Sequence, residues 1–158
     1  MYTKNSTETK RLAAKLAKRI AAAVKKNKNS KGATVVALVG DLGAGKTTFV
    51  QGFARGLGIK EKITSPTFLI YKKYLISKTS LTNFYHVDAY RIKKLSELKP
   101  IKFKEILADP KNLVIIEWAD LIKKALPKKI VTVAFKHHQA NIRNILIKNF
   151  KIRPAFNR

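Results

Sequence analysis

The first thirty residues have apolar positions at the spacing of an amphipathic helix. Apolar side chains return every four residues, at Leu12, Leu16, Ile20 and Val24. Alanines lie beside them and lysines occupy the opposite face. Ser6 is placed to cap the start of this helix, and Lys25–Gly32 interrupts the pattern. We therefore expect a packing helix from Ser6 to about Val24, with a basic face toward solvent.

The rest of the chain alternates between strand-like and helical patterns. Two segments, Ala33–Val39, which is apolar except for Thr34, and the continuously apolar Leu113–Ile116, are typical of strands buried on both faces of a parallel sheet. The remaining patterns predict a helix after Lys46 ended by Gly56 and Gly58, strands at Phe68–Leu75, Leu81–Val87, Ile130–Phe135 and Ile142–Lys148, and short helices at Lys94–Leu98, Phe103–Leu107 and Ala119–Ala125. The segment Ile76–Ser80 fits either a hairpin or two neighbouring strands. Together the elements predict an α/β fold with a central mixed sheet flanked by helices.

Length and composition restrict the class of protein further. The chain has 158 residues, of which 46% are hydrophobic, and this suits a single domain over residues 1–158. Cysteine is absent, which excludes a disulfide framework, a thiolate zinc site and a catalytic thiol. The polar first ten residues do not resemble a targeting segment, and no apolar run is long enough to span a membrane. We expect a soluble cytoplasmic protein, monomeric on its own.

One segment carries a specific chemical signal. The residues Gly40-Asp41-Leu42-Gly43-Ala44-Gly45-Lys46-Thr47 fit the phosphate-loop (Walker A) pattern G-x-x-x-x-G-K-[ST], between a predicted buried strand and a predicted helix. Glycines let successive backbone N–H groups and the positive helix end face a phosphate. Lys46 is then expected to reach the terminal phosphates and Thr47 to ligate Mg²⁺, while Thr48 is placed to contact the α-phosphate.

The placement of the nine acidic residues indicates where a metal could bind. Glu117 closes the apolar strand Leu113–Ile116, the position of the second acidic motif of phosphate-loop enzymes. Asp88 ends the strand Phe84–Val87 in the same way. We expect Glu117 to lie at the metal, with a strand-end ion pair as the alternative. For Asp88 a catalytic and a structural role remain equally open.

Other residues have both a functional and a structural interpretation. Ser65 and Thr67 flank Pro66 in a turn that could sense the terminal phosphate through a hydroxyl or could merely start a strand. Trp118, the only tryptophan, could cover the metal site or belong to the core. The three histidines, His86, His137 and His138, have no ligand-like spacing to acids and are interpreted as structural or surface residues.

Four linked motifs resemble a known family. They are Gly-Asp-Leu-Gly-Ala-Gly-Lys-Thr-Thr at 40–48, Thr-Ser-Pro-Thr-Phe at 64–68, Tyr-His-Val-Asp-Ala-Tyr-Arg at 85–91 and Ile-Ile-Glu-Trp at 115–118. In this order they resemble the bacterial TsaE family, the small ATPase subunit needed to make N6-threonylcarbamoyladenosine at position 37 of tRNAs that read codons beginning with A. The resemblance extends from Thr9 to Arg143.

The resemblance implies a P-loop NTPase fold, ATP and Mg²⁺ as ligands, and slow hydrolysis by the subunit alone. It also implies TsaB and TsaD as partners, with TsaD performing the transfer to tRNA. On this model Thr47 and Glu117 hold magnesium, Asp88 assists hydrolysis, and Trp118 is the aromatic residue beside the metal acid. Ser65 and Thr67 match the switch-like turn. Nucleotide binding is assigned to the loop residues Gly40 to Thr48 together with Thr9 and Arg143.

The net charge of +25 suggests a polyanionic partner, but it does not define a function. It comes from 34 basic and 9 acidic residues, and the basic ones are 27 Lys and 7 Arg spread over the whole length. A dispersed lysine coat fits solvation as well as it fits an anion-binding face. We expect contact with tRNA through the partner complex, and the sequence leaves direct contact open.

Two other functions compete with the ATPase subunit. A small P-loop kinase would transfer the γ-phosphate of ATP to a small-molecule hydroxyl, with Asp88 as the base. A nucleic-acid binding module would use the basic coat without chemistry and would bind RNA without ATP. The family resemblance favours the ATPase, since the residue pattern alone predicts only a protein that binds ATP and Mg²⁺.

Overall fold

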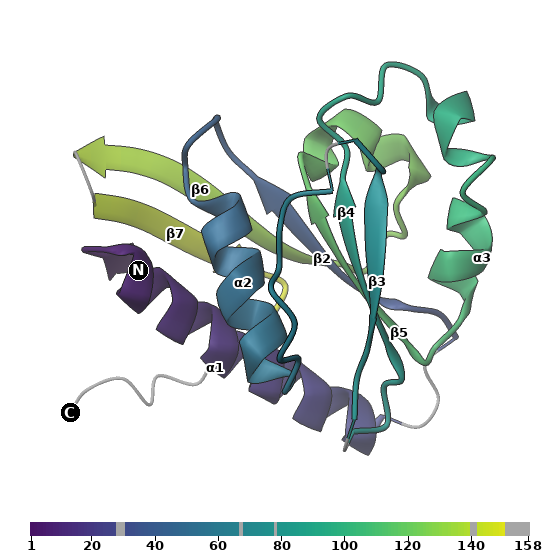
Figure 1. The fold of residues 1–158 in the computed structure, drawn as a ribbon, viewed down its shortest axis with the longest axis horizontal. Coiled ribbons are helices and arrows are strands. Elements are labelled where there is room, and N and C mark those ends of the chain that lie inside the picture. Colours follow the sequence, from purple (N-terminus) through teal and green to yellow (C-terminus); the bar gives the residue numbers. More distant parts are fainter. Residues whose placement is uncertain (28–30, 67, 78, 140–141, 151–158) are drawn as a thin grey trace.

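The chain forms a seven-stranded mixed sheet with helices on both faces (Figure 1). The computed structural model describes residues 1–27, 31–66, 68–77, 79–139 and 142–150. In chain order its elements are β1 (Tyr2–Thr3), α1 (Ser6–Lys26), β2 (Thr34–Val39), α2 (Lys46–Gly56), β3 (Tyr71–Leu75), β4 (Asn83–Asp88), the 3₁₀ helix η1 (Leu95–Leu98), α3 (Phe103–Ala108), β5 (Asn112–Glu117), the 3₁₀ helix η2 (Ala119–Ala125), β6 (Val131–Gln139) and β7 (Ile142–Lys148). This architecture confirms the predicted α/β class.

The strand order in the sheet is β1-β7-β6-β2-β5-β4-β3. The central strands β6, β2, β5 and β4 run parallel to one another, whereas β3 pairs antiparallel with β4 at one side and β7 pairs antiparallel with β6 and β1 at the other. The segments β3 and β4 are thus antiparallel neighbours, which settles the arrangement that the sequence left open. Because β2 and β5 lie at the centre and are covered on both faces, their interior residues 35–39 and 113–116 are apolar, as the sequence pattern predicted.

Helices α1 and α2 pack together on one face of the sheet, and α3 and η2 cover the other (Figure 1). The contact between α1 and α2 is close because two glycines of α2 face α1. A Cβ atom added at Gly52 would lie 2.3 Å from the carbonyl oxygen of Lys10, and one at Gly56 would lie 2.5 Å from that of Ala14. The two glycines therefore let the backbones of α1 and α2 approach each other.

The N-cap of helix α1 lies one residue before the expected cap, Ser6. The N-cap is Asn5, whose side chain accepts a hydrogen bond from the backbone N–H of Glu8 at 2.9 Å, and Ser6 is the first helical residue. Asn is as good a cap as Ser, so a cap one position earlier keeps the capping contact.

Among the described helices, none combines the length and the apolar character that a bilayer-spanning helix requires.

The strand predicted at Phe68–Leu75 begins later, at Tyr71. Phe68 and Leu69 are exposed, the Leu69 N–H donates to the carbonyl of Pro66 in a turn, and Ile70 has a positive φ of 63°. The apolar residues Phe68 and Leu69 therefore did not indicate burial here, whereas Ile70 is partly buried against the core. The short strand β1 was not predicted, because two residues that pair with β7 leave no repeating pattern. The helix at Ala119–Ala125 is a 3₁₀ helix with non-helical angles at Ile122.

The sheet brings three strand ends and one helix start to the same edge. In the parallel register Asp88 of β4 lies opposite Glu117 of β5, and Glu117 lies opposite Leu38 of β2. The loop after β2 leads directly into α2. The carboxyl ends of parallel strands are where α/β folds bind ligands, so this edge is the candidate site.

Candidate functional site

Glycines shape the loop between β2 and α2. Gly40, Gly43 and Gly45 all have positive φ angles, of 144°, 75° and 100°. At Gly40 space is limiting too, because a Cβ there would lie 2.6 Å from the carbonyl oxygen of Phe135. These angles are rare for residues with side chains, so the sequence G-x-x-G-x-G is required by the backbone path. The loop has the form expected of a phosphate cradle.

Lys46, the first residue of α2, folds back into this loop. Its ammonium donates to the carbonyl oxygens of Gly40 at 2.6 Å and Asp41 at 2.8 Å. The same nitrogen lies 3.7 Å from the ring centroid of Trp118, a cation–π contact. Burial lowers the pKa of Lys46 from its ordinary value, while the carboxylate of Glu117 acts in the opposite direction. The loop thus holds a buried cation at its centre.

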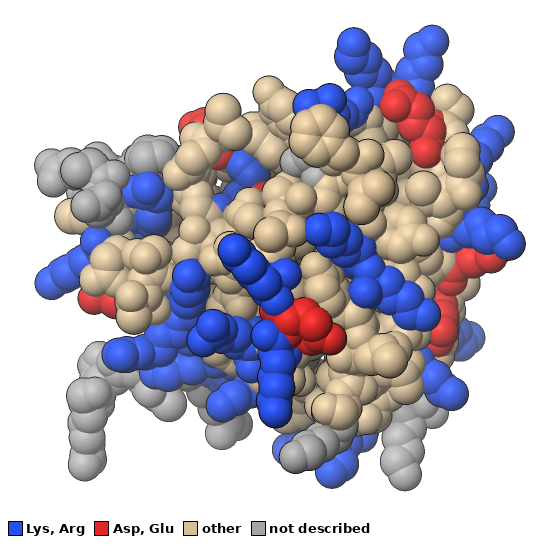
Figure 2. Space-filling model, viewed as in Figure 1, with Lys and Arg blue, Asp and Glu red and all other residues tan. Residues whose placement is uncertain are grey.

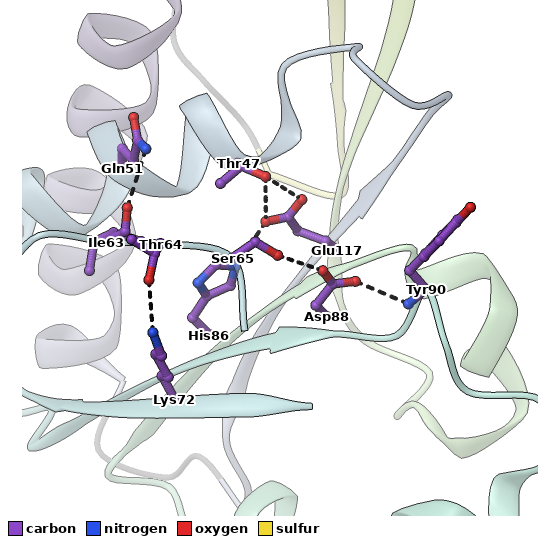
Figure 3. Close-up of polar contacts among 10 residues, drawn as sticks. All are labelled: Thr47, Gln51, Ile63, Thr64, Ser65, Lys72, His86, Asp88, Tyr90 and Glu117. Carbon is purple, nitrogen blue, oxygen red and sulfur yellow. Dashed lines mark hydrogen bonds and ion pairs between the residues drawn. The ribbon is translucent and has the colours of Figure 1, made fainter. Parts of the chain in front are cut away.

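Thr47 and Glu117 are in direct contact (Figure 3). The Thr47 hydroxyl lies 3.0 and 2.9 Å from the two carboxylate oxygens of Glu117 and donates to them. Glu117 is 3% exposed, so its carboxylate depends on protein donors in place of water. The two residues expected to hold magnesium are therefore adjacent in the folded chain.

Asp88 is held by two donors beside this pair (Figure 3). The Ser65 hydroxyl donates to Oδ2 of Asp88 at 2.7 Å, and the backbone N–H of Tyr90 donates to Oδ1 at 3.0 Å. The Gln51 side chain donates to the carbonyl of Ile63, at the start of the turn that carries Ser65. The hydrogen bond from Ser65 to Asp88 links this switch-like turn to the end of β4. Thr67, predicted for the same turn, lies outside the described residues.

The loop lies between two cavities. One, of about 470 Å³, is lined by the loop and helix residues Leu42 to Thr48 and by Ser65, Asp88, Tyr90, Glu117 and Trp118. The other, of about 280 Å³, is lined by Asn5, Ser6, Thr9, Gly43, Gly45, Thr48 and Arg143. Thr48 faces both cavities, at the first turn of α2. A ligand that follows the loop can therefore occupy both.

Thr9 and Arg143 lie at the second cavity, away from the acids. The Thr9 hydroxyl is bonded to the hydroxyl of Thr3 at 2.8 Å and to the carbonyl of Asn5 at 3.2 Å. Arg143, on β7, directs Nη2 toward the carbonyl of Gly43 at 3.4 Å. Both residues line the cavity that Gly43, Gly45 and Thr48 of the loop also line.

Trp118 has features of both interpretations offered by the sequence. It has a left-handed backbone conformation, with φ at 57°, and its ring packs on Tyr90 with centroids 5.0 Å apart. It also packs against the core on the α3 side of the sheet and is only partly buried. The turn directly after Glu117 thus places the indole over Lys46.

His86 is a site residue that the sequence interpretation missed, and Tyr90, Asn5 and Ser6 also line the two cavities without having been predicted as site residues. It is fully buried, and its Nε2 lies 2.8 Å from Oε1 of Glu117 (Figure 3). His86 precedes Asp88 by two residues on β4, so both side chains leave the same face of the sheet. This spacing was visible in the sequence, but the contact with Glu117 depends on the pairing of β4 with β5.

The oxygen atoms that meet at this site are suitable ligands for magnesium. A hydroxyl and two carboxylates are hard oxygen ligands, and Mg²⁺ in nucleotide sites takes one or two protein groups together with phosphate oxygens and water. Within the described ranges no group of three or more His, Cys, Asp or Glu side chains could hold a metal alone. The site therefore fits a metal that binds together with a phosphate ligand, and magnesium binding by Thr47 and Glu117 stays a prediction.

Comparison with known proteins agrees with these features. Residues 3–145 match the model of the family described as threonylcarbamoyl adenosine biosynthesis protein TsaE. A relative from Bacillus subtilis with that function in its name is 41% identical over 102 residues, which are 65% of this chain and 61% of the relative. One from Rickettsia felis is 39% identical over 130 residues, 82% of this chain and 67% of the relative. The chain thus matches just over three fifths of the Bacillus protein's own length.

A solved structure shows the same fold. The crystal structure of Bacillus subtilis YdiB superposes with a TM-score of 0.67 at 33% identity, covering 92% of this chain and 80% of YdiB. The structural match extends well beyond the phosphate loop. Since the family model matches most of its length, this chain belongs to the TsaE family of threonylcarbamoyl adenosine biosynthesis proteins.

Proposed function

We propose that the protein binds ATP with Mg²⁺ and hydrolyses it as a subunit of the machinery that adds threonylcarbamoyl to adenosine 37 of tRNAs reading codons that begin with A. The observation that carries this proposal is the contact of Thr47 with Glu117 at the start of the phosphate loop helix. It brings the loop hydroxyl and a strand-end carboxylate to one point, as Mg²⁺·ATP binding requires.

ATP would lie along the loop. The triphosphate would lie in the cavity beside Glu117, where loop N–H groups and the N-terminus of α2 favour an anion, and the nucleoside would lie in the cavity at Thr9 and Arg143. To meet the terminal phosphates, the ammonium of Lys46 exchanges the carbonyls of Gly40 and Asp41 for phosphate oxygens. Lys46 thus holds the loop together before ATP binds.

Hydrolysis would use the two acids differently. A bound Mg²⁺ would offset the negative charge that develops on the phosphate oxygens. Thr47 and Glu117 would hold that ion, while Lys46 contacts the transferred phosphoryl group. Asp88 would orient the attacking water, because Ser65 and the Tyr90 N–H fix its carboxylate beside the cavity. Ser65 would connect the phosphate to the turn at 63–66.

The proposed partners are TsaB and TsaD, with tRNA carried by that complex. The family's role in threonylcarbamoyl adenosine biosynthesis supports this placement. Lysine and arginine side chains are dispersed over the face shown in Figure 2, with few acids among them. Such a surface would attract an acidic subunit or tRNA at low salt, and the attraction would weaken as salt increases.

One assay tests the whole proposal. ATP turnover and the yield of modified adenosine are measured with and without purified TsaB–TsaD and tRNA, for wild type and for Lys46→Ala. We expect turnover that requires Mg²⁺, an increase with the partners, and loss of both signals in the variant. An unchanged rate and yield would refute the pathway role, and turnover retained by Lys46→Ala would refute the loop assignment. Transfer of γ-phosphate to a metabolite, with no free phosphate, would indicate the kinase.

A further inference from the structure

A buried histidine lies behind the magnesium acid. The imidazole of His86 has 0% exposure, and its Nε2 contacts Oε1 of Glu117 at 2.8 Å. The Thr47 hydroxyl approaches the same carboxylate from α2, at 3.0 Å from Oε1 and 2.9 Å from Oε2. Glu117 is therefore held between a residue of the phosphate loop helix and a residue of the neighbouring strand.

The other nitrogen of this ring has no matching contact. Among the described residues, Nδ1 of His86 is the buried side-chain nitrogen or oxygen without a hydrogen-bond partner. A buried polar atom left unpaired lowers the free energy of unfolding, by about 1–3 kcal/mol in general. An apolar side chain would avoid this cost, so packing alone does not explain a histidine here. Its contact with Glu117 is what an apolar residue could not provide.

We propose that His86 is a positioning residue, which donates from Nε2 to Glu117 and fixes the orientation of that carboxylate toward bound Mg²⁺. This inference rests on the proposed function. The β4–β5 register explains why the contact is possible, since His86 lies opposite Ile115 and Asp88 opposite Glu117. His86 and Asp88 therefore leave one face of β4, one behind Glu117 and the other beside it.

A fixed carboxylate matters because the ion is small. Mg²⁺ requires nearly ideal octahedral geometry at short distances, so a carboxylate that rotates freely binds it less well. Mutation of a group that hydrogen-bonds to a metal-binding side chain usually lowers metal affinity or activity about 10–100-fold. His86 acts through Glu117, and it touches neither the nucleotide nor the ion.

Two amide variants provide the test. His86→Gln carries its amide N–H near the position of Nε2, within reach of Glu117, whereas His86→Asn ends near Nδ1 and is too short. Mg²⁺ is titrated into the whole protein with a non-hydrolysable ATP analogue, and the Mg²⁺ concentration at half-maximal binding is measured by calorimetry. We expect His86→Asn to raise this midpoint about tenfold or more and His86→Gln to stay near wild type.

The controls separate positioning from stability. Val87→Ala removes a buried side chain from the opposite face of the same strand, so it should lower the melting temperature and leave the Mg²⁺ midpoint unchanged. If His86→Asn does not fold, His86→Phe replaces it, because the ring keeps its volume and loses the donor. Kinetics should show the same division, with the Mg²⁺ requirement altered more than kcat at saturating Mg²⁺.

The outcomes distinguish the two proposals. A folded His86→Asn or His86→Phe with the wild-type Mg²⁺ midpoint would overturn the positioning role, and so would equal shifts in the Gln and Asn variants. Wild-type protein that binds the analogue without any Mg²⁺ dependence would instead overturn the proposed function. Recovery in His86→Gln alone would support His86 as the donor that orients Glu117.

Discussion

Thr47 and Glu117 are seventy positions apart in the chain, yet the hydroxyl of Thr47 contacts both carboxylate oxygens of Glu117. The sheet explains this proximity. The strand β2 leads into the loop and α2, and its neighbour β5 ends at Glu117, which lies opposite Leu38. The parallel pairing of β2 with β5 therefore places a loop residue and a strand-end acid next to each other. The site is assembled by the register of the sheet.

The hydroxyl of Thr47 is expected to be essential for Mg²⁺ binding. Thr47→Ala should raise the Mg²⁺ requirement of ATP hydrolysis about tenfold or more, because the metal loses a ligand and Glu117 loses a donor. Thr47→Ser keeps the hydroxyl and should behave like wild type. The measurement is the initial rate over a Mg²⁺ series at saturating ATP. Equal rates for the Ala and Ser variants would contradict the assignment.

Substitutions of Asp88 and Glu117 should impair different properties, the catalytic rate for Asp88 and Mg²⁺ binding for Glu117. Asp88→Asn is expected to lower kcat about 100-fold with little change in the Mg²⁺ midpoint, since it would lose the base that orients water. Glu117→Gln should raise the Mg²⁺ midpoint as its first effect. Phosphate release and analogue binding, measured on the same samples, separate these effects. Should Asp88→Asn change only the Mg²⁺ midpoint, Asp88 would be a metal ligand.

The charge of Lys46 should destabilise the protein before ATP binds. Burial lowers its pKa in the folded state, so the charged form costs folding free energy. This cost is fully present below the folded-state pKa, and it disappears as the pH rises past the unfolded-state value of about 10.4. The wild type should therefore gain stability as the pH rises toward this value, and Lys46→Met should lack this gain, so the stability difference between the two proteins should change with pH.

Urea unfolding of both proteins at a series of pH values measures this difference. The exposed Lys60 gives the matched control, because Lys60→Met removes a charge without removing a buried one. A stability difference for Lys46→Met that stays constant between neutral pH and pH 10 would show that the charge of Lys46 is not the cause.

The close contact of α1 with α2 makes Gly52 sensitive to any added atom. Gly52→Ala would place a Cβ 2.3 Å from the carbonyl oxygen of Lys10, so the helices must separate. We expect the free energy of unfolding to fall by at least about 1–3 kcal/mol, the loss typical of overpacked cores. Arg55→Ala, on the same helix but exposed, should change stability far less. Calorimetry compares the two melting temperatures.

The sequence predicted the loop and both strand-end acids because each depends on local patterns. Gly40 to Thr47 form a contiguous motif, and Glu117 directly follows four apolar residues that indicate a buried strand. The elements that bring them together have the predicted order. In α/β folds, ligands generally bind at the carboxyl ends of the parallel strands. The location of the site at this edge of the sheet could therefore be predicted as well.

The contacts that depend on pairing could not be predicted. His86 meets Glu117 only through the register of β4 with β5, which no spacing along the chain defines. The exposed Phe68 was predicted to lie in a strand because apolar residues usually indicate burial. In the structure its ring contacts Arg91, with the guanidinium carbon 4.5 Å from the ring centroid, beside a turn. Such a contact between separate segments leaves no periodic signal.

The contact of Trp118 with Lys46 gives the protein a built-in optical reporter. Trp118 is the only tryptophan in the sequence, and the ammonium of Lys46 lies 3.7 Å from its ring centroid. A phosphate that draws this ammonium away from the Gly40 and Asp41 carbonyls would also change the surroundings of the indole. Emission at tryptophan wavelengths would then record nucleotide arrival and departure in real time, without a label, in a complex whose other tryptophans are replaced.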